Sequence, residues 1–185
     1  MAAVKGTAWL TLKSFLSERS GADAMARVLA RLGPSDAEAL RRNSLPGSWG
    51  DYGADTRVLL AADDVLGRGD RTLIRDSAVH HARKDMRGIY RMFIRVATPG
   101  FVIGRAAKLW RLIIDSGELR VVRQTPKGVD LELTNIEGVP PHHELDQLPF
   151  MEEIARMTGA KNVQATHPKC LARGDDRCVY IVRWE

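Results

Sequence analysis

Apolar residues recur at every third or fourth position through most of the first 115 residues of the chain. This spacing places them on one face of a helix, and glycine or proline separates one run from the next. The longest predicted helix runs from Arg71 to Ala97, with Asp70 as its N-cap and Pro99 after its end. The predicted helices contain residues 9–16, 25–32, 35–43, 58–66, 71–97, 102–113 and 144–158.

Two segments between these helices carry further local signals. Ser35 and Glu38 have the spacing of a capping box, in which each side chain satisfies a backbone amide at the start of a helix. The stretch 45–53 contains Trp49 and Tyr52 among glycines. It is predicted to be a loop whose two aromatic rings pack down onto the core.

After Gly117 the hydrophobic period changes from about four to two. Apolar residues of 119–133 alternate with polar ones on both sides of a turn at 125–128, which predicts a hairpin with one wet face. A second hairpin is predicted in 160–184, around Gly174. Because helices come first and strands mostly last, the pattern predicts an α+β fold, with N-terminal helices packed on a C-terminal four-stranded antiparallel sheet.

Composition narrows the class of protein. A chain of 185 residues with 44% hydrophobic content suits one domain, residues 1–185, with a sizeable core. Two cysteines, no apolar leader and no membrane-length apolar stretch indicate a cytoplasmic protein. The net charge of +5 is compatible with nucleic acid, acidic lipid or an acidic protein, and selects none of them.

The second hairpin contains both cysteines. Cys170 and Cys178 lie eight positions apart on either side of the turn, and His167 precedes Cys170 by three. Imidazole and thiolate are ligands that zinc prefers. Two interpretations stay open: the three side chains bind a metal with a fourth ligand, or the cysteines are reduced core thiols and His167 bonds to the backbone. A disulfide is not expected in a reducing compartment.

The C-terminal pattern resembles that of a known superfamily. His167-x-x-Cys170, seven residues with Gly174 near their middle, and Cys178-x-Tyr180 are similar to the C-terminal signature of the 4-vinyl-reductase domain. Its relatives include the heme-NO-binding superfamily and the TRAPP trafficking subunits. The opening residues 4–7 are similar to the start of the heme-NO-binding group. The stretches 67–70 and 170–180, with Pro99, resemble a large myxobacterial paralogous family of this fold.

The resemblance implies a heme-NO-binding and TRAPP-like fold over nearly the whole chain, in a superfamily of sensors, scaffolds and tethering subunits. In its phenol-sensing activators, zinc is held by a Glu at the place of His167, by two cysteines that match Cys170 and Cys178, and by an upstream cysteine. His142, His143 and Glu144 stand at that upstream distance here, and one of the three is expected as the fourth ligand, with Glu144 entered in the candidate site. Zinc is thus the metal expected if the cluster binds one. Heme is not expected, because the Tyr-x-Ser-x-Arg motif of heme-binding members is absent.

Two further surfaces are predicted to bind. The resemblance implies an interior pocket for a small apolar ligand, with a filled core as the alternative. Arginines at every fourth position of the longest helix form a row that is either a docking strip for an anionic partner or a solvated face. The pocket residues are Met92, Phe93, Phe101 and Trp110, and the row is Arg83, Arg87, Arg91 and Arg95.

No catalytic motif supports an enzyme, since the chain lacks a Ser-His-Asp order with supporting residues and a phosphate-binding glycine loop. We expect a non-catalytic bacterial sensory module that binds a ligand, forms a homodimer and signals through a protein partner in trans. The alternative is an interaction or dimerisation scaffold without a ligand. Nucleic acid is not an expected partner, because no helix-turn-helix or zinc-finger spacing is present.

Overall fold

The computed structural model describes residues 1–86, 97–108 and 110–185. It has the predicted α+β fold with a four-stranded antiparallel sheet. The short strands β1 and β2 and the 3-10 turn η1 were not predicted. The elements are β1 Ala3–Lys5, α1 Gly6–Ser20, α2 Ala24–Arg31, α3 Pro34–Arg42, β2 Trp49–Asp51, α4 Tyr52–Leu66, α5 Thr72–Met86, α7 Pro99–Lys108, α8 Trp110–Ile113, β3 Glu118–Thr125, β4 Gly128–Thr134, α9 Glu144–Met157, β5 Gln164–Lys169, η1 Leu171–Arg173 and β6 Cys178–Arg183.

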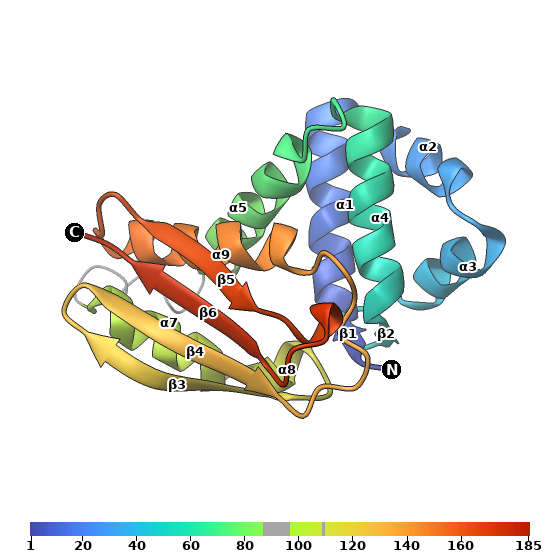
Figure 1. Cartoon of the computed structure of the whole chain (residues 1–185). Coiled ribbons are helices and arrows are strands. Elements are labelled where there is room, and N and C mark those ends of the chain that lie inside the picture. Colours follow the sequence, from blue (N-terminus) through green and yellow to red (C-terminus); the bar gives the residue numbers. More distant parts are fainter. Residues whose placement is uncertain (87–96, 109) are drawn as a thin grey trace.

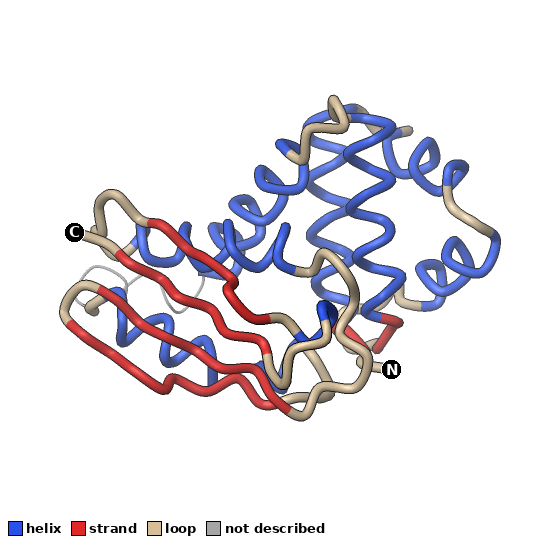
Figure 2. Tube along the Cα trace, viewed as in Figure 1, coloured by secondary structure: helices blue, strands red, loops and turns tan. Residues whose placement is uncertain are grey.

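The helices of the N-terminal half stand beside the sheet. Helices α1 and α4 run side by side, α2 and α3 lie on their outer side, and α5 leads toward the sheet (Figure 1). Helices α7 and α9 cover one face of the sheet, while no helix covers the other face in this view (Figure 2). Alternation along β4 explains this arrangement, because its apolar side chains all turn toward the two helices.

The strand order in the sheet is β3-β4-β6-β5, with every neighbouring pair antiparallel. In this register Leu131 lies opposite Tyr180 and Leu133 opposite Cys178, so that buried side chains of β4 and β6 share one face. Both edge strands are irregular. The register of β3 shifts between Val121 and Arg123, and that of β5 shifts after Thr166.

The apolar core has two main clusters. One contains α1, α2, α4 and the start of α5, with Leu16, Val28 and Val58 fully buried. The other lies between the sheet and the helices α7 and α9, around Leu131 and Tyr180. Burial of this kind stabilises the fold by roughly 25 cal/mol per Å² of apolar surface removed from water.

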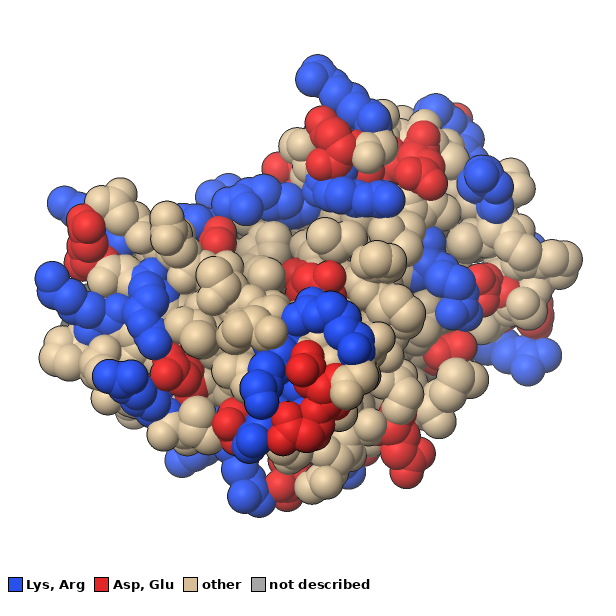
Figure 3. Space-filling view, viewed as in Figure 1, with Lys and Arg blue, Asp and Glu red and all other residues tan. Residues whose placement is uncertain are grey.

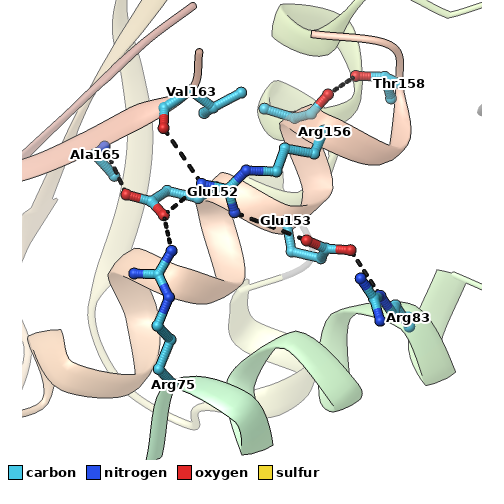
Figure 4. A network of polar contacts seen from close by, with 9 residues as sticks. Arg75, Arg83, Glu152, Glu153, Arg156, Thr158, Val163 and Ala165 are labelled. Carbon is cyan, nitrogen blue, oxygen red and sulfur yellow. Dashed lines mark hydrogen bonds and ion pairs between the residues drawn. The ribbon is translucent and has the colours of Figure 1, made fainter. Parts of the chain in front are cut away.

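Ion pairs join the two halves where α5 packs against α9 (Figure 4). Arg83 Nε on α5 donates to Glu153 Oε1 on α9 at 2.7 Å, and Arg75 Nη2 donates to Glu152 Oε2 at 3.0 Å. The same Glu152 accepts from Arg156 Nη2 at 2.8 Å and from the backbone N–H of Ala165 on β5 at 3.1 Å. One carboxylate therefore ties α5, α9 and β5 together.

Two local predictions were wrong. The capping box at Ser35 does not form, because α3 begins one residue earlier with Pro34 in its first turn and Gly33 before it. Glu38 instead pairs with arginines later in α3. Trp49 does not pack down; its side chain is 42% exposed and the ammonium of Lys5 lies over its ring, whereas Tyr52 is buried as expected.

The start of the longest predicted helix agrees with the structure, and its C-terminal part lies outside the described residues. Ile74, Ala78 and Ala82 of α5 form the predicted buried stripe. Asp70 accepts a hydrogen bond from Thr72 N–H at 3.0 Å. The buried carboxylate of Asp63 at the end of α4 also accepts from the N–H groups of Arg71 and Leu73, at 3.0 and 3.2 Å. No described helix is long and apolar enough to cross a membrane.

Replacing Asp63 by alanine is expected to lower the free energy of unfolding by about 2–4 kcal/mol, because two backbone N–H groups at the start of α5 lose a charged acceptor. Asp64→Ala is the matched control, since the neighbouring side chain is 52% exposed and makes one long ion pair with Arg71. Urea denaturation of both variants measures the difference. Equal, small losses would show that Asp63 does not hold the α4–α5 corner.

Candidate functional site

Four side chains with metal-ligating atoms meet beneath the terminal hairpin. His143 comes from the turn before α9, His167 from β5, Cys170 from the end of that strand and Cys178 from the start of β6. One ligand atom from each lies within 4.8 Å of the others. His143, Cys170 and Cys178 are buried, and both thiols are free. The fold thus brings together three predicted ligands and His143.

Hydrogen bonds fix the tautomer of His143. Its Nδ1 lies 2.9 Å from the carbonyl oxygen of Pro140, which can only accept, so Nδ1 carries the proton. Burial lowers the pKa of His143, which keeps the ring neutral. Nε2 is then an acceptor, and the hydroxyl of Tyr180 donates to it at 3.0 Å. The lone pair of Nε2 points toward the cluster, with Cys178 Sγ at 3.8 Å.

His167 stacks on Tyr180, with ring centroids 4.5 Å apart and 6° between the planes. Neither of its ring nitrogens has a hydrogen-bond partner among the described residues. Burial, with the neighbouring His143, lowers the pKa of His167 to about 4. Burial also raises the pKa of the Cys178 thiol to about 11. At neutral pH both imidazoles and the Cys178 thiol are therefore uncharged.

Nitrogen and sulfur donors of this kind suit borderline and soft cations, so these four side chains are the described ones that could hold a metal ion. Glu144, the predicted fourth ligand, is not in the group. Its side chain is 23% exposed, and its Oε2 lies 3.8 Å from Nδ1 of His143, the ring nitrogen that bonds to Pro140. His143 takes that place because its ring points into the interior. Metal ligation itself stays a prediction.

A second polar group lies between α4 and α9. Asp55 and Asp146 border a small cavity of about 10 Å³ together with Tyr52 and His143. Burial, with the neighbouring carboxylate of Asp146, raises the pKa of Asp55 to about 7. Burial raises the pKa of Asp146 as well. Two half-buried carboxyl groups that share one cavity cannot both ionise without cost.

The predicted ligand pocket is not found as one site in the described residues. Phe101 is 59% exposed on the outer side of α7, so it does not line the interior. Trp110 is half-buried, and its Nε1–H donates to the carbonyl of Ser116 at 2.9 Å. Met92 and Phe93 lie outside the described residues. A larger hollow lies elsewhere, between α1 and α5.

This hollow has a volume of about 430 Å³ and is lined by residues of two helices. Phe15 on α1 and His80 on α5 make its aromatic part, with ring centroids 5.3 Å apart. Charged side chains of both signs complete it: Glu18, Asp76, Arg83 and Lys84. Its size lies in the range of small-molecule sites.

Of the predicted arginine row, only Arg83 is described. Its guanidinium is paired with the carboxylate of Glu153, so its charge is partly neutralised within the molecule. Arg87, Arg91 and Arg95 lie outside the described residues, and the docking strip stays a prediction. Sequence reasoning also missed Tyr180 and Asp55. Only strand alternation, which puts Tyr180 on the face of Cys178, could have indicated one of them.

Comparison with solved structures identifies the fold. The chain matches the Fe(II) unliganded H-NOX protein of K. algicida at a TM-score of 0.71 and 8% identity, over 98% of this chain and 96% of that one. An H-NOX protein of S. oneidensis in the Fe(II) ligation state matches at 0.71 and 12%, over 98% and 96%. An oxygen-binding H-NOX domain related to soluble guanylate cyclases matches at 0.68 and 12%, over 98% and 95%.

No protein-family model and no curated protein matches the sequence. At 8–12% identity the structural matches show a shared H-NOX fold and nothing finer. The heme-NO-binding part of the resemblance is thus confirmed at the level of fold. The likeness to the 4-vinyl-reductase, TRAPP and myxobacterial groups has no support among these matches.

The cofactor prediction is contradicted. We expected zinc if the cluster binds a metal, and we did not expect heme. Two of the matching proteins are described in an Fe(II) state, and the description of another concerns heme distortion in the H-NOX family. None of those descriptions names zinc. Among the described histidines, His80 is the one that borders the larger hollow. It supplies an imidazole beside a space of small-molecule size.

Tyr180→Phe is expected to lower the free energy of unfolding by about 1–3 kcal/mol, because the buried Nε2 of His143 loses its donor. A double-mutant cycle with His143→Ala isolates the coupling between the two side chains. Denaturant melts of the four proteins at pH 8 give the four free energies. Additive losses would contradict the assigned hydrogen bond.

Asp55→Asn is expected to stabilise the protein by about 1–3 kcal/mol at pH 7 and to have little effect at pH 4. The pKa of Asp55 in the folded state, about 7, lies above the unfolded value of 3.8. The unfolded chain therefore ionises first, and stability falls as pH rises from about 4 to 7. Asp64→Asn, on the same helix and exposed, is the control. A difference between variant and wild type that is constant across this pH range would contradict the raised pKa.

Proposed function

We propose that the chain is a non-catalytic sensory module that binds a small ligand and passes the bound state to a protein partner. The observation that carries this proposal is the backbone match to H-NOX proteins over 98% of the chain. Those proteins are described in unliganded, NO-bound, CO-bound and oxygen-bound states. The fold in which those proteins bind different ligands extends over 98% of this chain.

Heme is the ligand class that the comparisons bring forward. When bound, it would supply an iron that takes up a diatomic gas. The imidazole of His80 would hold the iron, and Phe15 would offer a ring against which a flat group can pack. Lys84, on the wall of the same hollow, would face a carboxylate of the ligand. The chain departs from heme-binding members in lacking the Tyr-x-Ser-x-Arg motif.

Titration with hemin tests this site. We expect saturable binding of one hemin per chain, with an absorption band that changes when His80 is replaced by alanine. His142→Ala is the matched control, because His142 is exposed and lies in the turn before α9. Binding that is absent, or that is identical in the wild type and in His80→Ala, would show that this hollow is not a heme site.

The alternative is an interaction scaffold without a ligand, acting as a homodimer. The observation behind it is that the cavity between α4 and α9 measures only about 10 Å³, which is room for about one water molecule, so that a ligand would have to occupy the hollow between α1 and α5. Native mass spectrometry of the purified protein separates the two functions. A ligand-free dimer supports the scaffold, and a chain that carries a small molecule supports the sensor.

A further inference from the structure

The outer side of α7 and α8 combines apolar and basic side chains. We call this the α7–α8 surface. Its members are all exposed and stand on two consecutive helices within 13 residues. Residues 99–113 contain no Asp or Glu. The members are Phe101, Arg105, Lys108, Arg111, Leu112 and Ile113.

Helical spacing aligns the central members on one side. Positions 101, 105 and 108 of α7 follow one another by four and three residues, the spacing of neighbours on one helix face, and position 112 lies on the next helix, α8. The opposite side of α7 is fixed in the sheet core by Val102, Ile103 and Ala107, all buried. Along α7 the aligned side, from position 101 to 108, spans about 10 Å at 1.5 Å per residue. It has one apolar side chain followed by two cations, and α8 adds the apolar side chain of Leu112.

The apolar members of this surface are unusually open to water. Phe101 is 59% exposed, Leu112 61% and Ile113 37%. They account for three of the seven large hydrophobic side chains exposed in the described part of the chain. Single exposed apolar residues are common, but a group of them beside one another indicates a surface that another body covers.

The basic members form no ion pair with a described carboxylate. This distinguishes them from arginines such as Arg57, Arg75 and Arg183, whose charges are neutralised by aspartate or glutamate nearby. Residues 99–127 hold six basic and two acidic side chains, a net charge of +4 within a chain of net +5. By contrast, basic and acidic side chains are interspersed on the face seen in Figure 3.

We propose that the α7–α8 surface docks on an anionic lipid leaflet. A second copy of the chain would place like charges against one another. A protein partner would bury Phe101 or Leu112 in one of its own pockets, and its anchor residues would need a pocket on the α7–α8 surface. The two hollows described above lie between other helices. A bilayer interface needs no such pocket, since isolated apolar side chains enter it while arginine and lysine meet the lipid phosphates.

Vesicle sedimentation tests this docking. The protein is mixed with vesicles of phosphatidylcholine alone or of phosphatidylcholine with about one third phosphatidylserine, a fraction that makes the surface strongly anionic. We expect binding to the anionic vesicles only, weakened by salt. Arg105→Glu with Lys108→Glu should reduce the affinity about tenfold or more. Phe101→Ser with Leu112→Ser should reduce the part of the binding that survives high salt.

The matched control is Arg27→Glu with Arg31→Glu, which makes the same charge change on the exposed side of α2. Melting temperatures of all variants should stay close to that of the wild type, because the changed side chains are exposed. If the control variant loses as much vesicle binding, the effect comes from net charge alone and the proposal is overturned. Binding of a poly-glutamate peptide without vesicle binding, or dimerisation abolished by the α7–α8 changes, would also overturn it.

Discussion

The contact between α5 and α9 decides how the two halves of the molecule sit together. Glu153 is almost fully buried, so its charge depends on Arg83 and Arg156 for compensation. Glu152 extends the same network to β5 through the backbone of Ala165. A buried carboxylate that loses its partner is costly, whereas apolar contacts tolerate small shifts. The network therefore specifies one orientation of helices against sheet, and the hairpin cluster depends on it because β5 carries His167.

The hairpin cluster shows how the sheet register controls chemistry. Cys178 and Tyr180 share one face of β6 because side chains alternate along a strand. The Tyr180 ring supports His167 by stacking, and its hydroxyl orients His143. The two imidazoles and the Cys178 thiol are kept neutral by their burial. Such a group can either remain a polar network within the core or exchange its protons for a cation.

The sequence was informative wherever the hydrophobic period was unbroken. The buried stripe of α5, the hairpin of β3 and β4 and the approach of Cys170 to Cys178 all follow from periodicity and turn residues. It was insufficient where local spacing allows a side chain more than one partner or direction. His142, His143 and Glu144 stayed open as the fourth ligand, because nothing local shows which of neighbouring residues points inward. Glu38 was assigned to a cap, but arginines one turn later attract it more strongly.

The cofactor prediction failed for a related reason. Ligand types and spacing around Cys170 and Cys178 describe a donor set, but the cofactor of a fold is fixed by side chains from many elements. His80 and Phe15, which approach each other from α5 and α1, are 65 residues apart and carry no shared motif. Only tertiary packing shows that they border one hollow.

The irregular edges of the sheet limit how the protein can associate. Strand β3 is bent by its register shift near Val122, and β5 contains Pro168, which has no N–H to offer a neighbour. An added strand would find neither edge straight enough to form a continuous ladder. Both edges therefore disfavour growth of the sheet by strand addition, which is also a route to aggregation. This favours complexes that are built through side chains over complexes that share backbone pairing.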